Sequence, residues 1–352
     1  MKATPGISSS VVRLVAVLTV VGVASAIQFP AQPEARQAQR SARSPNQGRG
    51  GQPPNVDNVE LHVLPVQGNV YMLVGAGGNV TLQIGKDGVL LVDTGTAQVS
   101  DKVLAEIRKL TDKPIRYIIN THVHPDHVGG NEAIGKIGST IAGGNVGGDA
   151  PRGATIIAHE NVMNRMSAPT GTQAPFPPAA WPTDTFFTKQ KEIYFNDEAI
   201  VVMHQPAAHT DGDSIVFFRR SDVISTGDMF LTTSYPIIDR QRGGTLNGII
   251  KALNVLLDLA IPREKQEGGT YLIPGHGRLC DEADLLEYRD MVTIIRDRIE
   301  DFVKKGMTLE QVKAAKPTLD YDGRYGATAG NWTTDMFIEA VYNEMKGAGA
   351  RK

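Results

Sequence analysis

The chain carries three histidines and one aspartate within six residues, directly after an apolar run that predicts a strand. They are His122, His124, Asp126 and His127. In extended chain, residues two apart point to the same side, so His122 and His124 are expected to face one centre. Pro125 is expected to bend the chain and to turn the next two residues toward a second centre. Unpaired imidazoles and carboxylates are costly to bury, so the cluster predicts a metal site; the alternative is a solvated polar loop.

Three later residues complete the donor set for two metal shells. His209, Asp228 and His276 each stand at the end of a strand-like run or in a glycine-bearing turn. Alone, each is a weak signal, because a lone histidine after a strand is more often a hydrogen-bonded structural residue. The only cysteine, Cys280, has no paired base in the sequence and is expected to be structural. The ligands are therefore imidazoles and carboxylates, which zinc accepts.

Strands and helices in alternation are expected to position these residues. Alternating or apolar runs between turns predict strands over 61–66, 69–75, 79–85, 88–95, 115–120 and 154–160, then over 192–197, 199–205, 214–220, 222–228 and 270–275. Helical spacing of apolar residues predicts helices over 99–110, after 130, over 245–260, after 281 and over 333–345. An α/β (α+β) fold of two sheets packed face to face, with helices outside, would bury both apolar sheet faces.

The composition is that of a soluble globular protein preceded by a leader. Hydrophobic residues make up 41% and charged residues 21%, and the formal net charge of −2 gives no reason to expect a nucleic-acid partner. Residues 1–26 have a basic start, an uncharged run and a small-residue end, which predict a cleaved signal peptide. The alternative is an uncleaved membrane anchor. Residues 27–57 predict a disordered linker, and one folded domain is expected over 58–352.

The HxHxDH motif of residues 122–127, followed by His209, Asp228 and His276, resembles the metallo-β-lactamase superfamily. The resemblance covers roughly residues 59–278, and the ligand set is similar to that of hydroxyacylglutathione hydrolases (glyoxalase II) and related lactonases. It implies a four-layer αβ/βα sandwich with two zinc ions per chain at one edge. One zinc would be held by His122, His124 and His209, the other by Asp126, His127 and His276, with Asp228 bridging them. Asp93, in the run GVLLVDTG, would brace the histidine loop.

The function expected from these features is that of an exported zinc hydrolase, periplasmic or secreted if the source is bacterial. Zinc lowers the pKa of bound water to about 7, so a hydroxide could attack an ester, thioester, lactone or amide carbonyl of a small molecule. Asp126 is placed to orient that nucleophile or to take its proton, and is the predicted catalytic residue. No membrane insertion is expected after signal cleavage.

Three rival functions stay open. A class B β-lactamase would use the same chemistry, but two-zinc enzymes of that class usually have Cys or Ser where this chain has Asp228. The Cys-bearing enzymes also tend to have Lys where it has Leu231. A metal-dependent oxidoreductase, of the persulfide dioxygenase or di-iron type, is the second rival. A catalytically silent binding protein is the third, and the complete ligand set argues against it.

Other features give weaker signals. The glycine-rich run 75–78 precedes a strand rather than a helix, so a hairpin turn is expected instead of a dinucleotide-binding loop. His62, His159 and His204 carry no motif and are expected to be packed or exposed rather than ligands. Two long stretches, 140–153 and 167–185, interrupt the elements and could be lids or mobile loops. Aromatic residues of the second stretch could form a wall over the metals or anchor it to the core; these are Phe176, Trp181, Phe186 and Phe187.

Overall fold

The computed structural model describes residues 58–140, 153–169, 174–265 and 268–349. The predicted signal peptide and linker lie outside the described residues. Residues 141–152, most of the long stretch 140–153, lie outside them too. Within the described part of the chain, no helix combines the length and the apolar character needed to cross a membrane.

The first half of the chain builds a seven-stranded sheet in which the strands follow one another in sequence order. Strands β1 to β4 pair antiparallel, and β4 to β7 pair parallel. The parallel order places the carboxyl ends of β4, β5 and β6 at one edge. The strands are β1 (His62–Gln67), β2 (Val70–Val74), β3 (Val80–Gly85), β4 (Gly88–Val92), β5 (Ile115–Ile119), β6 (Thr155–His159) and β7 (Asp184–Phe186).

The second half builds a five-stranded sheet in the order β12-β11-β10-β9-β8. Strands β8 to β11 form an antiparallel meander, and β12 returns parallel to β11 after a helical crossover. The ends of β11 and β12 therefore reach the same edge. The strands are β8 (Gln190–Phe195), β9 (Glu198–His204), β10 (Ser214–Phe218), β11 (Val223–Leu231) and β12 (Tyr271–His276).

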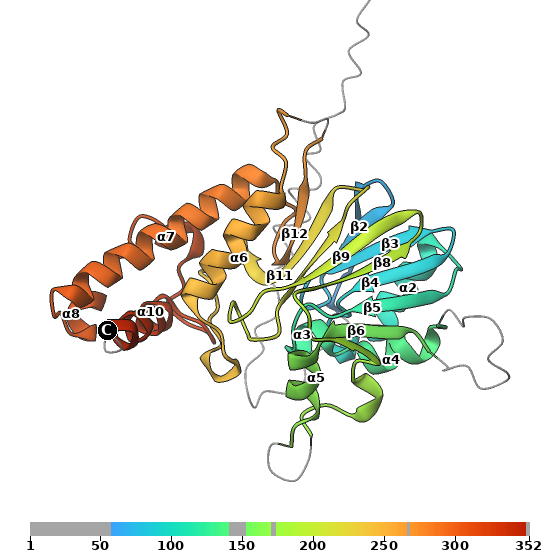
Figure 1. Ribbon diagram of the computed structural model, residues 1–352, viewed down its shortest axis with the longest axis horizontal. Coiled ribbons are helices and arrows are strands. Elements are labelled where there is room, and N and C mark those ends of the chain that lie inside the picture. Colours follow the sequence, from blue (N-terminus) through green and yellow to red (C-terminus); the bar gives the residue numbers. More distant parts are fainter. Residues whose placement is uncertain (1–57, 141–152, 170–173, 266–267, 350–352) are drawn as a thin grey trace, which may run out of the picture.

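Three apolar clusters show that the fold has four layers. On the fully buried strand β4, Leu90 and Val92 face the other sheet, while Val89 and Leu91 face the helices behind the first sheet. The middle cluster joins the two sheets, and a third cluster lies between the second sheet and its helices. Figure 1 shows the helices of the second sheet, α6, α7 and α10, on the left. The predicted αβ/βα sandwich is thus confirmed.

The helices agree with the predicted ones, with additions. Helix α3 occupies the bend predicted at Pro125, and α5, η3, β7, α8 and α9 were not predicted. The sequence signal for α5 is weak because the helix is short. The helices are α2 (Ser100–Leu110), α3 (Pro125–Val128), α4 (Asn131–Ile137), α5 (Glu160–Ser167), α6 (Leu246–Leu259), α7 (Glu282–Lys304), α8 (Leu309–Ala314), α9 (Asp322–Tyr325) and α10 (Thr334–Gly349), with short 3-10 turns η2 (Ala97–Val99), η3 (Pro178–Ala180) and η4 (Arg240–Arg242).

The last helix is joined to α6 by one carboxylate. Glu344 of α10 accepts hydrogen bonds from the backbone N–H groups of Leu246 and Asn247 and from the Asn247 side-chain amide, at 2.7, 3.1 and 2.8 Å. The first N–H groups of a helix have no partner within the helix and carry partial positive charge. Glu344 therefore caps α6 from a distant part of the chain.

We expect Glu344→Ala to lower the free energy of unfolding by about 1.5–3 kcal/mol, the range for hydrogen bonds to a charged group. Chemical denaturation measures it. The matched control is Glu339→Ala, also on α10, which removes an ion pair with Lys313 of α8 and should cost about 0–1 kcal/mol. Equal losses of unfolding free energy in the two variants would show that the Glu344 cap stabilises the protein no more than an exposed ion pair does.

Candidate metal centre

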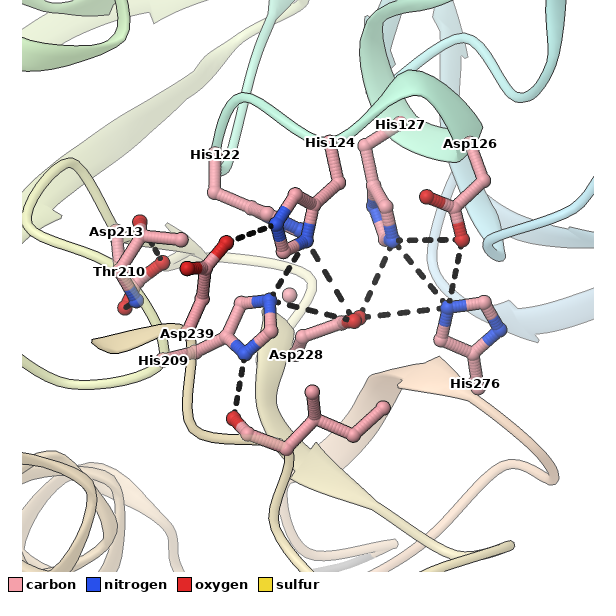
Figure 2. A network of polar contacts seen from close by, with 12 residues as sticks. His122, His124, Asp126, His127, His209, Thr210, Asp213, Asp228, Asp239 and His276 are labelled. Carbon is pink, nitrogen blue, oxygen red and sulfur yellow. Dashed lines mark hydrogen bonds and ion pairs between the residues drawn. The ribbon is translucent and has the colours of Figure 1, made fainter. Parts of the chain in front are cut away.

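The structure brings all seven predicted ligand residues to one edge of the sandwich, between the two sheets (Figure 2). His122 and His124 lie in the loop after β5, and Asp126 and His127 lie on α3. His209 comes from the β9–β10 loop, and His276 ends β12.

Asp228 is placed differently from the prediction, because β11 does not end there but continues to Leu231. The pairing of β11 with β12 shifts register around Gly227, whose φ of 53° is left-handed. A side chain at Gly227 would press on Thr121 of the histidine loop. This irregularity lets Asp228 stand in the centre from inside a buried strand.

The donor atoms form two adjacent groups. His122, His124, His209 and Asp228 make the first, called here the four-ligand group, and the remaining three residues make the second, called the three-ligand group; within each, the donor atoms lie within 4.8 Å of one another. The three-ligand group consists of Asp126, His127 and His276.

Asp228 stands between the groups and faces both. Its Oδ2 lies 3.9 Å from His122 Nε2 and 3.7 Å from His209 Nε2. Its Oδ1 lies 3.1 Å from His127 Nε2 and 3.6 Å from His276 Nε2. One carboxylate oxygen thus serves each group, as a bridging ligand would require.

Divalent cations fit this arrangement. Among the described residues, His122 Nε2 and Asp228 Oδ1 are buried without a hydrogen-bond partner, which costs free energy unless something else binds them. His124 Nδ1 and His209 Nε2 point at each other across 2.9 Å. Imidazole nitrogens and carboxylate oxygens are donors that divalent metal ions accept, and here they form two groups that could each hold an ion.

Burial and the neighbouring carboxylates shift the pKa values of the histidines in opposite directions. Burial lowers the pKa of His209 to about 4, and burial together with the nearby His127 lowers that of His122 well below its usual value. Burial also opposes the charged form of His127, but Asp228 and Asp93 outweigh it and raise its pKa well above the usual value. The rings of His122 and His209 are thus held neutral, the form that binds a metal.

The centre opens to solvent on one side. The side chains of His124 and His276 are each 20% exposed and that of Asp126 is 23% exposed, whereas His122, His127 and His209 are essentially fully buried. A small molecule could therefore reach the site between Asp126 and the exposed imidazoles.

Asp93 contacts the histidine loop in the way that the resemblance implied. Its carboxylate accepts hydrogen bonds from the backbone N–H and the hydroxyl of Thr121, at 2.8 and 2.7 Å. The same carboxylate lies 2.8 Å from His127 Nδ1 and directs Nε2 toward the centre. Such outer contacts set the tautomer and orientation of ligand imidazoles.

Two further contacts of this kind were missed by the sequence analysis. Asp239 Oδ2 lies 2.9 Å from His124 Nε2, and the carbonyl of Ile237 lies 2.7 Å from His209 Nδ1. Arg242 holds the Asp239 carboxylate with its backbone N–H and its guanidinium. No local motif marks an aspartate in this loop, and a backbone carbonyl leaves no trace in the sequence.

Two glycines leave the space that the ligands occupy. A Cβ on Gly275 would overlap Asp228 Oδ1, and a Cβ on Gly78 would stand 2.7 Å from His127 Nε2. Gly78 belongs to the predicted turn 75–78, which indeed connects β2 to β3. The glycine run therefore forms the predicted turn and borders the centre.

The histidines outside the motif do not join either group. His159 and His204 stack on each other with ring centroids 3.5 Å apart, and His62 is partly exposed beside Glu60.

Cys280 is buried, and its thiol lies 3.3 Å from the carbonyl of Arg278. Burial raises the pKa of this thiol well above the usual value.

Three of the four aromatic residues in or beside the stretch 167–185 pack in apolar clusters and anchor this stretch to the core. Trp181 donates a hydrogen bond to the carbonyl of Phe176, and both pack on an apolar cluster beneath α5. Phe186 is buried between the sheets and Phe187 is exposed.

Comparison with known proteins gives a family and a fold. The sequence model of the metallo-beta-lactamase superfamily matches residues 66–276. A linear primary-alkylsulfatase from a Pseudomonas species is 54% identical over 49 residues, which are 14% of this chain and 9% of that protein.

Solved structures of low sequence identity also align with this chain. The stereoselective inverting sec-alkylsulfatase Pisa1 from Pseudomonas sp. aligns with a TM-score of 0.58 and 18% identity, covering 81% of this chain and 50% of that one. A metallo-beta-lactamase from Pontibacter korlensis aligns with a TM-score of 0.49 and 17% identity, covering 66% and 99%. The matched regions span half or less of the length of the two alkylsulfatases.

Gly275→Ala is expected to abolish metal binding at one or both groups, because its methyl group would displace the Asp228 carboxylate. Zinc content after dialysis measures the loss. Gly323→Ala, a position with nothing within 4 Å, is the matched control and should keep its metal. Full zinc content in the Gly275 variant would contradict the central position of Asp228.

The stacked pair of His159 and His204 makes the free energy of unfolding depend on pH. Burial, then the nearby His204, lowers the pKa of His159 from 6.5 to about 4, although Asp211 opposes the shift. Because the folded state disfavours the proton, this contribution to stability is complete above pH 6.5 and is lost as the pH falls toward 4.

In metal-free protein, the melting temperature should therefore fall between about pH 7 and about pH 5 less steeply in His159→Gln than in the wild type. His62→Gln, which changes an exposed histidine, should leave the wild-type slope. The same slope in all three proteins would rule out a depressed pKa at His159.

Proposed function

The chain belongs to the metallo-β-lactamase superfamily, and on that premise we propose that it is a dinuclear metallohydrolase with a preference for zinc. The observation that carries this proposal is the pair of adjacent ligand groups that share Asp228. The buried His122 Nε2, which has no hydrogen-bond partner, supports it further, because a cation would satisfy it.

Bound divalent ions would supply Lewis acidity, which activates water at neutral pH and balances negative charge developing on the substrate. The chain's own contribution is to orient the reactants. Burial opposes ionisation of Asp126, but His127 and His276 outweigh it and hold its pKa well below the usual range. The Asp126 carboxylate lies 3.1 Å from His276 Nε2 at the open side of the centre, so we assign Asp126 the role of orienting the attacking water.

The substrate is proposed to be a small ester, thioester, lactone or amide. A second candidate is a sulfate ester, favoured by the short stretch of 54% identity to a linear primary-alkylsulfatase. Both reactions place negative charge on oxygens beside the metal pair. The substrate would enter on the side where Asp126 and His276 are exposed.

β-Lactams are disfavoured by the residues after Asp228. Phe230 is buried in the core of the second sheet and its helices, and Leu231 is also buried, so neither can contact a drug carboxylate. The hydroxyl of Ser234 donates to the carbonyl of Tyr235, and the Tyr235 hydroxyl is directed at the C-terminal helices. Arg240 remains as an exposed anchor for an anion.

Export to the periplasm or the medium is part of this proposal and is supported by the leader-like residues 1–26. It is independent of the chemistry at the metal centre.

The metal content tests the proposal directly. Elemental analysis of the purified protein should give two divalent ions per chain at saturating zinc, and Asp228→Ala should lose metal and most activity because Asp228 faces both groups. His204→Ala and His159→Ala should keep both ions. One ion or none in the wild type would refute a dinuclear site.

A substrate panel separates the candidates. We expect kcat/KM on an acyl lactone, a thioester or a linear alkyl sulfate to exceed that on a penicillin and a carbapenem. The highest value on the alkyl sulfate would select the sulfatase candidate. A carbapenem value near about 10⁵ M⁻¹s⁻¹, ordinary for an enzyme on its own substrate, would identify a β-lactamase instead.

A further inference from the structure

Residues 234–239, called here the brace segment, touch the four-ligand group at three points. The carbonyl of Ile237 accepts from His209 Nδ1 at 2.7 Å, and the Asp239 carboxylate lies 2.9 Å from His124 Nε2. The backbone N–H of Asp239 donates to the carbonyl of His209 at 3.0 Å. Figure 2 shows His124 and His209 held between Asp228 and this segment.

The preceding residues of the brace segment are held by the C-terminal helices. The Tyr235 hydroxyl lies 2.8 Å from the Asp322 carboxylate and 3.1 Å from the carbonyl of Thr318, so its proton has two acceptors. Trp332 Nε1 donates to the carbonyl of Pro236 at 3.1 Å. The Tyr235 ring is buried and stacks on Phe337, with centroids 4.8 Å apart.

The brace segment therefore has two ends with separate partners. Residues 234–236 contact α7, α9, α10 and the loops between them, while residues 237–239 contact the ligands. Pro236 has a fixed φ, and the side chain of Ile238 is buried in the core between the second sheet and its helices. Contacts made at one end are thus carried to the other by a short, packed stretch of chain.

We propose that the C-terminal segment, residues 308–349, is a positioning element for the four-ligand group. By fixing the brace segment, it holds the rings of His124 and His209 in the orientation that binds a divalent cation. The inference rests on the proposed metal centre. It gives a role to a part of the chain that follows the family-matched residues 66–276 and contributes no ligand to either group.

The test measures zinc affinity of each group separately, by competition with a chromophoric chelator in the full chain. A His276→Ala background leaves the four-ligand group intact, and a His124→Ala background leaves the three-ligand group. Tyr235→Phe removes only the hydroxyl that bonds to the C-terminal segment. Tyr342→Phe is the matched control, because its hydroxyl bonds to the carbonyl of Met307 within the same helical region.

In the His276→Ala background, Tyr235→Phe should weaken zinc binding roughly fivefold, within the range of couplings carried through packed networks. Trp332→Phe should act in the same direction, and Tyr342→Phe should have no effect. In the His124→Ala background, Tyr235→Phe should leave zinc affinity unchanged.

Equal zinc affinity for the Tyr235 and Tyr342 variants at the four-ligand group would overturn the proposal. Equal weakening of both groups would overturn it too, because it would reveal general loosening rather than positioning. If Tyr235→Phe does not fold, Trp332→Phe decides by the same criteria. Absence of zinc binding in the wild type would instead refute the proposed metal centre, and this inference with it.

Discussion

Asp228 is the residue on which the rest of the centre depends, because its two oxygens face two different groups of imidazoles. A carboxylate buried this deeply is stable only where positive charge or a metal compensates for lost hydration. The surrounding structure is arranged to keep it there. The irregular pairing of β11 with β12 places it inside a buried strand, and Gly275 of β12 leaves the space for its oxygen.

Each half of the chain supplies one aspartate that orients a ligand of the histidine loop. Asp93 follows β4 of the first sheet and holds His127 and Thr121. Asp239 follows β11 of the second sheet and holds His124 across the interface. The histidine loop is therefore fixed from both sheets, and relative movement of the sheets would misplace the rings. The apolar cluster between the sheets resists that movement, because buried close-packed side chains deform little.

The C-terminal helices extend this arrangement outward. They bury the outer face of the second sheet, cap α6 through Glu344, and hold the segment that contacts His124 and His209. Stability and ligand geometry are thus coupled in this region. Loosening of these helices would reach the four-ligand group through residues 234–239. His127 of the three-ligand group is instead held from the first sheet by Asp93.

The sequence by itself determined the seven residues of the two donor groups as a set and the order of nearly all strands. The HxHxDH spacing, the alternation of apolar residues and the glycine turns are local patterns, so each can be read within a few residues. It also identified Asp93, although only through the resemblance. Only the tertiary structure decided that Asp239, Ile237 and the C-terminal helices support the site, and that Phe176 and Trp181 anchor a loop. These roles arise from contacts between residues far apart in the chain, such as His124 with Asp239 and Pro236 with Trp332. No local pattern records such a contact, because it exists only once packing has brought the two segments together.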